Sequence, residues 1–197
     1  MDRIDFLPSS ENPLSADVYL IRGDEYTYVV DVGSSDGAYA LIQEIDKKKV
    51  IITHFHDDHM KNLSRLEIAK EDLFIGEHTQ KVLRIPAYNK EGTVVTAPIT
   101  ITDGVSITIW PVPSSHAKGS LGVTVDNEYL LIGDGYYCSS KGYNVSLLHD
   151  EIKTLKGMSF TKVIKSHDEK IYDRDEVIAE LENIYARNEK GNPYINI

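Results

Sequence analysis

The sequence is poor in the features that mark secreted and membrane proteins. It has one cysteine, Cys138, so no disulfide can form within the chain, which is typical of reducing compartments. No apolar run approaches the ~20 residues that cross a bilayer. The beginning, residues 1–6, lacks the cationic and apolar regions of a secretory signal. These absences predict a cytoplasmic protein with no membrane partner.

Basic residues are scarce relative to acidic ones. The chain has 21 Lys and Arg against 31 Asp and Glu, which gives a net charge of −10. Such a charge repels polyanions and argues against nucleic acid as a partner. It does not exclude a small anionic substrate, because bound divalent ions reverse the local field. We therefore expect a small-molecule substrate and no nucleic acid. The oligomeric state is left open.

The composition indicates one globular domain. At 197 residues, with 41% hydrophobic and 26% charged residues, the chain can bury a sizeable core. It has no short-period repeat, no low-complexity tract and no linker that would divide it. We therefore expect a single domain over residues 1–197.

Hydrophobic periodicity predicts an α+β fold with strands grouped in each half of the chain. Residues 1–15 predict an irregular lead-in, and residues 17–21 and 26–31 predict a hairpin. Further strands are expected at 49–53, 99–102, 106–110, 121–125, 129–132 and 160–165. Helices are expected at 38–45, 60–72, 78–85, 145–155 and 174–187. This order favours two sheets covered by helices.

A cluster of metal-type ligands follows the predicted strand at 49–53. Residues 54–59 read HFHDDH, which places three histidines and two aspartates within six positions. Three later apolar runs also end in a potential ligand, namely His116, Asp134 and His167. If these strands share a sheet edge, their tips converge and hold the ligands at low reorganisation cost.

The type and number of these ligands suit a pair of ions. Imidazole and carboxylate without thiolate suit Zn, Fe or Mn, whereas structural zinc sites usually contain more cysteine. His54 and His56 face the same way on an extended segment and can chelate one ion. Asp58 and His59 follow as the chain turns toward a helix and aim at a neighbouring point. Seven groups are too many for one tetrahedral ion: His54, His56, Asp58, His59, His116, Asp134 and His167.

The order of these seven residues resembles the metallo-β-lactamase superfamily, and the resemblance covers nearly the whole chain. It implies a four-layer αββα sandwich with a dinuclear site at one edge of the two sheets. It also implies a ligand set for each ion. The first would be bound by His54, His56 and His116, the second by Asp58, His59 and His167, and Asp134 would bridge both.

Departures from the family pattern indicate which branch of the superfamily the chain resembles. Asp134 stands where many zinc β-lactamases have cysteine, which disfavours antibiotic hydrolysis. The chain is more similar to the glyoxalase-II-like and lactonase-like branch, although residues 113–116 and 166–168 depart from the glycine-containing motifs common there. Tyr137 lies three residues after Asp134, which is the offset of a catalytic tyrosine in some lactonases of the superfamily. It is a candidate catalytic residue, with simple packing as the alternative.

The resulting functional hypothesis is a metal-dependent hydrolase with two divalent ions, Zn²⁺ in the first place and Fe or Mn as alternatives. A hydroxide held by the two ions would attack an ester, thioester or lactone carbonyl. Asp58 would hold this nucleophile and accept its proton. Two alternatives remain open: a phosphodiesterase or nuclease of the same fold, and an iron-binding redox or dioxygenase-type protein.

Four other polar residues are expected to have roles other than metal binding. Asp57 is expected to cap a helix or support a ligand rather than bind an ion. Asp31 is expected to form a turn or support a ligand. His78 and His149 fall outside the ligand pattern and are expected to lie at the surface or in satisfied core positions.

Overall fold

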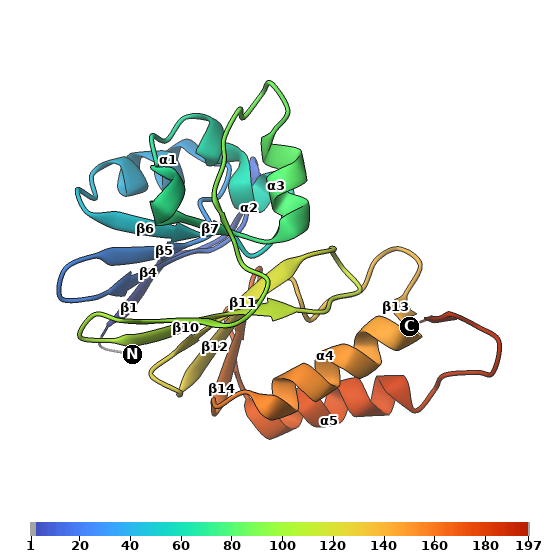
Figure 1. Cartoon of the computed structure of the whole chain (residues 1–197). Helices are drawn as coiled ribbons and strands as arrows, with labels where there is room; N and C mark the ends of the chain where they lie inside the picture. Colours follow the sequence, from blue (N-terminus) through green and yellow to red (C-terminus); the bar gives the residue numbers. More distant parts are fainter. Residues whose placement is uncertain (1–2, 197) are drawn as a thin grey trace.

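Two six-stranded sheets face each other in the computed structural model, which describes residues 3–196. Helices α1, α2 and α3 cover the outer face of the first sheet, and α4 and α5 cover the outer face of the second (Figure 1). The expected αββα sandwich is therefore confirmed. Among the described residues, no helix is long and apolar enough to cross a membrane.

The first sheet is built by the N-terminal half of the chain in the order β1-β4-β5-β6-β7-β8. Its first three strands pair antiparallel and the remaining pairs are parallel. The strands are β1 (Ile4–Leu7), β4 (Val18–Arg22), β5 (Thr27–Val30), β6 (Lys48–Ile51), β7 (Leu73–Ile75) and β8 (Thr93–Val94). The helices between them are α1 (Asp36–Gln43), α2 (Asp57–Met60) and α3 (Glu77–Leu83), with 3₁₀ turns η1 (Lys61–Ser64) and η2 (Lys70–Asp72).

The second sheet has the order β15-β14-β12-β11-β10-β9. Only β12 and β14 pair parallel, across the crossover that contains α4. The strands are β9 (Ile99–Thr102), β10 (Ser106–Val112), β11 (Ser120–Val125), β12 (Tyr129–Gly133), β14 (Lys162–Lys165) and β15 (Ile171–Asp173). Helices α4 (Val145–Gly157) and α5 (Arg174–Tyr185) lie side by side, and β13 (Tyr143–Asn144) pairs with β16 (Tyr194–Ile195).

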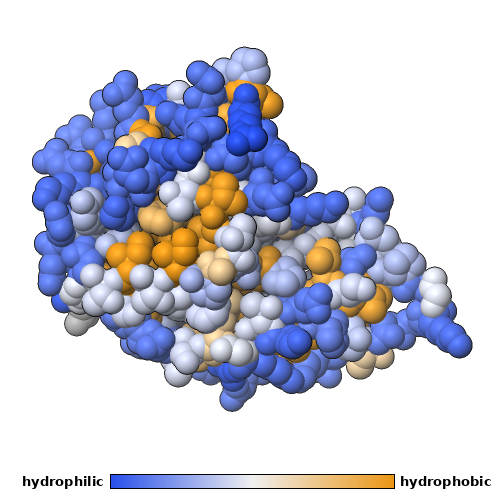
Figure 2. Space-filling view, in the orientation of Figure 1, coloured by the Kyte–Doolittle hydropathy of each residue, from blue (hydrophilic) through white to orange (hydrophobic). Residues whose placement is uncertain are grey.

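Three hydrophobic clusters fill the three interfaces between the four layers. One lies between the sheets and includes Ile21, Ile107 and Val123. One packs the first sheet against its helices, and one packs the second sheet against α4 and α5. Figure 2 shows hydrophilic side chains over most of the face in view and apolar ones along the seam between the two halves. The hydrophobic effect therefore holds each helix against its sheet through one apolar side.

Side-chain caps fix the starts of α1 and α4. The Ser35 hydroxyl accepts a hydrogen bond from the Ala38 amide at the start of α1. The Asn144 carbonyl oxygen accepts one from the Leu147 amide at the start of α4. Each bond satisfies a backbone donor that the helix leaves unpaired, which is why these helices begin where they do.

The sequence-based prediction was wrong mainly at short elements, and it lacked β7, β8, β13, β15 and β16. The N-terminal lead-in contains β1, which pairs with β4 at the sheet edge, and a small hairpin of β2 (Ser10–Glu11) and β3 (Leu14–Ser15). The helix expected over 60–72 is broken into a short α-helical turn and two 3₁₀ turns. Short elements carry too few residues for a hydrophobic period, and tertiary pairing decides them.

Candidate metal centre

Three histidines from two sheets form the first group of candidate ligands. His54 follows β6, His56 lies just before α2, and His116 lies in the loop after β10. Nδ1 of His56 is 3.0 Å from Nε2 of His54 and 3.0 Å from Nε2 of His116. One nitrogen of each ring lies within 4.8 Å of the others, a spacing that can hold one ion.

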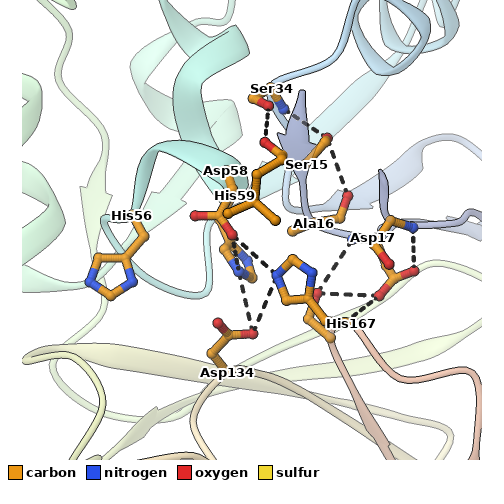
Figure 3. Close-up of polar contacts among 12 residues, drawn as sticks. Ser15, Ala16, Asp17, Ser34, His56, Asp58, His59, Asp134 and His167 are labelled. Atoms are coloured by element: carbon orange, nitrogen blue, oxygen red, sulfur yellow. Dashed lines mark hydrogen bonds and ion pairs between the residues drawn. The ribbon is translucent and has the colours of Figure 1, made fainter. Parts of the chain in front are cut away.

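Two aspartates and two histidines form the second group: Asp58, His59, Asp134 and His167. Nε2 of His167 is 3.1 Å from Oδ2 of Asp58, and Nε2 of His59 is 3.6 Å from the same oxygen. Asp58 and His59 belong to α2, whereas His167 follows β14 of the opposite sheet. Figure 3 shows these side chains pointing toward one another. The base of the site is buried, and His167 is exposed at its mouth.

The carboxylate of Asp134, a member of the second group, also faces the first. Its Oδ2 is 3.4 Å from Nε2 of His116, and its Oδ1 is 3.4 Å from Nε2 of His59. Oδ1 of Asp134 and Nε2 of His59 are buried and have no hydrogen-bond partner among the described residues. Buried polar atoms left unpaired are costly unless something binds them. The donor set therefore fits a pair of metal ions with Asp134 between them.

Asp31 contacts the His59 ring nitrogen that faces away from the site. Its Oδ2 is 2.7 Å from Nδ1 of His59, and its two oxygens accept hydrogen bonds of 2.8 Å from the amide and the hydroxyl of Thr53. Nδ1 of His59 therefore donates to Asp31, and Nε2 is left free to face the site. Asp31 has a φ of 60° at the end of β5, a left-handed conformation that aspartate tolerates better than most residues.

The electrostatic environment differs between the two groups. Burial, together with the neighbouring histidines, holds the pKa of His54 well below its usual value, which keeps the ring neutral and able to bind a metal. For His59, burial lowers the pKa, but the carboxylates of Asp31 and Asp134 outweigh it and raise the pKa to about 10. The second group therefore has the stronger attraction for positive charge.

Asp58 and His167 also shift each other. Burial raises the pKa of Asp58, but the hydrogen bond with His167 and the nearby His59 outweigh burial and lower it. The same hydrogen bond raises the pKa of His167. This pairing keeps Asp58, the residue expected to act as a base, in its ionised form.

The remaining residues singled out from the sequence lie around this centre. The hydroxyl of Tyr137 donates to the Ser166 carbonyl at 3.2 Å. Asp57 accepts a hydrogen bond from the Tyr88 hydroxyl at 3.0 Å and belongs to neither ligand group. His78 packs near Phe55, with ring centroids 5.1 Å apart, and His149 is exposed beside Asp150.

Sequence reasoning missed the residues that support the ligands through the backbone. Asp17 is buried, and its Oδ2 accepts a 2.7 Å hydrogen bond from the His167 amide. The hydroxyl of Ser166 lies 3.3 Å from the same oxygen. The sequence contained one indication of this role. Asp17 is a charged residue directly before the apolar strand β4, just as Asp31 directly follows its partner strand β5.

The two facing sheets, the covering helices and the histidine–aspartate cluster define an αββα protein with a candidate dinuclear centre. The sequence profile of the metallo-beta-lactamase superfamily matches residues 12–130. The chain belongs to this superfamily. A sequence comparison with curated proteins gives no match.

Solved structures support the same fold. A flavo di-iron protein from Thermotoga maritima is 13% identical with a TM-score of 0.69, and the match covers 89% of this chain and 55% of that one. A metallo-beta-lactamase superfamily protein from Sulfolobus tokodaii is 19% identical with a TM-score of 0.63, over 98% and 89% of the two chains. The DIM-1 metallo-beta-lactamase is 17% identical with a TM-score of 0.67, over 93% and 94%. This chain thus spans little more than half of the flavo di-iron chain.

Proposed function

We propose that this protein is a metal-dependent hydrolase that attacks an ester, thioester or lactone carbonyl of a small molecule. The ligands would be the seven residues of the two groups, with His54, His56 and His116 at the first ion and Asp58, His59 and His167 at the second. Asp134 would touch both ions. The observation that carries the proposal is the Asp134 carboxylate, which has one oxygen directed to each group.

Two bound divalent ions would lower the pKa of a water molecule toward ~7 and polarise the scissile carbonyl. The protein supplies the rest of the chemistry. Burial keeps the His54 ring neutral and able to bind a metal, and the Asp31–His59 hydrogen bond fixes which His59 nitrogen faces the site. Asp58 would orient the attacking water and accept its proton: its lowered pKa keeps the carboxylate ionised, so that it can accept a hydrogen bond from that water, and its position is partly exposed.

Tyr137 is proposed as a second catalytic residue. Its hydroxyl lies next to the peptide that carries His167. Burial first, and then the nearby carboxylates, raise the pKa of Tyr137 to about 12. The hydroxyl therefore keeps its proton at neutral pH and can donate a hydrogen bond to a substrate carbonyl oxygen.

An iron redox function is the second candidate. It is supported by the flavo di-iron proteins among the structural neighbours and by a nitrogen–oxygen donor set that suits Fe as well as Zn. The net charge of −10 gives less support to a nuclease or phosphodiesterase acting on polyanions. Metal analysis of protein expressed without added metal separates the first two: two zinc ions support hydrolysis, and iron supports redox chemistry.

The direct test is a substrate panel of thioesters, lactones and phosphodiesters assayed with metal-loaded protein. We expect turnover of the carbonyl substrates and its loss in Asp134→Ala, because the variant deletes the group shared by both ions. Its metal content should fall as well. Asp175→Ala, which removes an exposed carboxylate at the start of α5, is the matched control and should keep both. Full activity in Asp134→Ala would contradict the dinuclear proposal.

A further inference from the structure

We infer that Asp17 is a positioning residue that holds His167 in the conformation needed to bind the second ion. The inference rests on the proposed dinuclear site. Asp17 lies outside both ligand groups, directly before β4 of the first sheet, whereas His167 follows β14 of the second. Figure 3 shows Asp17 on the far side of His167 from Asp58 and Asp134.

The contacts of Asp17 show that its carboxylate serves the backbone rather than an ion. Oδ2 accepts a hydrogen bond of 2.7 Å from the His167 amide and one of 3.3 Å from the Ser166 hydroxyl. Oδ1 accepts a hydrogen bond of 2.8 Å from the Ser9 amide. The side chain is 4% exposed. Both oxygens are thus used within the protein, and hydrogen bonds to a buried carboxylate are strong.

The backbone of His167 needs such support. Its φ is 60°, in the left-handed region that is sterically unfavourable for residues with a Cβ. Glycine would relieve the strain at this position, but glycine has no imidazole to reach Asp58 and the second ion. The charged hydrogen bond from the His167 amide to Asp17 offsets the strain and keeps Nε2 of His167 3.1 Å from Asp58.

The same carboxylate connects the N-terminal segment to the site. Ser9 directly precedes the β2–β3 hairpin, and the Ala16 amide at the end of this hairpin donates to the carbonyl of Asp58 at 2.9 Å. Residues 9–17 are therefore fastened to two candidate ligands of the second group. No such contact with Asp17 is made by His54, His56 or His116, so the effect of Asp17 should be confined to the second ion.

The test is the affinity of each ion, measured by titrating chelator-stripped protein with Zn²⁺ in competition with a chromophoric chelator. Co²⁺ titration gives an independent spectrum for each site. Asp17→Asn keeps the shape of the side chain but has one acceptor oxygen where two are used. We expect its second-ion affinity to fall about 10-fold or more, with the first ion unchanged. Asp17→Ala should lose more.

Asp103→Asn is the matched control, because Asp103 also accepts hydrogen bonds from two backbone amides, those of Glu25 and Tyr26. It should leave both affinities unchanged. Wild-type affinities in Asp17→Asn, or equal weakening of both ions, would overturn the inference, and so would an Asp103→Asn variant that behaves in the same way. If Asp17→Ala does not fold, Asp17→Asn decides. Fewer than two ions in the wild type would instead refute the dinuclear proposal itself.

Discussion

At the scale of single residues, the proposed catalytic role of Tyr137 depends on what its hydroxyl can bind. The Tyr137 amide donates to the Asp134 carbonyl at 2.9 Å, so the turn after β12 delivers the tyrosine beside the candidate centre. Its hydroxyl donates to the Ser166 carbonyl, a bond that it could exchange for one to a substrate.

Tyr137→Phe should therefore lower kcat by about 10- to 100-fold with little change in KM, because the lost donor acts on charge that develops in the transition state. Steady-state kinetics on a lactone substrate would measure this. Tyr136→Phe is the control, since Tyr136 is buried in the cluster beside α4 and α5. An unchanged kcat in Tyr137→Phe would leave Tyr137 with a packing role only.

Glu151 is a second unusual residue, remote in sequence from the candidate ligands. It is fully buried in α4, and neither carboxylate oxygen has a hydrogen-bond partner among the described residues. Burial raises the pKa of its carboxyl well above the usual value. The unfolded chain releases this proton at a lower pH than the folded protein does, so this group's contribution to stability is lost as pH rises.

Glu151→Gln should therefore gain stability relative to the wild type as pH increases. The gain should begin near the unfolded carboxyl pKa of about 4.3 and grow by up to about 1.4 kcal/mol per pH unit until the folded pKa is passed. Urea unfolding between pH 4 and 8 would measure it. The exposed Glu189→Gln should show no such trend, and a pH-independent difference for Glu151→Gln would contradict the argument.

At the scale of secondary-structure elements, the segment after β6 approaches the end of β12, where Thr53 lies close to Gly133. Gly133 ends β12 with a φ of 57°, immediately before Asp134. A Cβ on Gly133 would lie 2.5 Å from the hydroxyl oxygen of Thr53. Thr53 in turn binds Asp31, which holds His59. Glycine thus allows the two sheets to approach closely enough for Asp134 to reach the candidate ligands that follow the first sheet's strands.

Gly133→Ala should destabilise the protein by about 2–5 kcal/mol, from the left-handed backbone and from overpacking against Thr53. It should also weaken metal binding by displacing Asp134. Thermal denaturation and metal analysis would test both effects. Gly157→Ala is the control, because nothing lies within 4 Å of a Cβ there. Equal stability of the two variants would refute the packing argument.

At the scale of the whole molecule, the candidate ligands come from both sheets. His54, His56, Asp58 and His59 belong to the first half, and His116, Asp134 and His167 to the second. The cluster between the sheets also draws on both halves, from Ile4 to Ile164. We propose that residues 1–197 form one domain and that bound ions tie its two halves together.

Removing metal with a chelator should therefore lower the melting temperature by about 10 °C without unfolding the protein at 25 °C. Ligand at ~1,000 times its Kd stabilises by about 4 kcal/mol, and each kcal/mol shifts the midpoint by about 2–4 °C for a chain of this size. Differential scanning calorimetry before and after chelation would measure this, with Zn²⁺ restoring the midpoint. Equal midpoints with and without metal would contradict the tie between the halves.

The sequence by itself determined the types of the candidate ligands, their spacing and most of the long elements. The HFHDDH cluster predicted a metal site because its chemistry is local. The strand–helix pattern was sufficient for two covered sheets because long elements carry a clear hydrophobic period.

Only the tertiary structure decided how the ligands are supported. Asp17 and His167 are 150 positions apart, and their contact depends on how the two sheets pack. The left-handed backbone of Asp31 and His167, the edge strand β1 and the approach of Gly133 to Thr53 likewise leave no periodic trace in the sequence. They are set by long-range packing, which no local pattern of residues encodes.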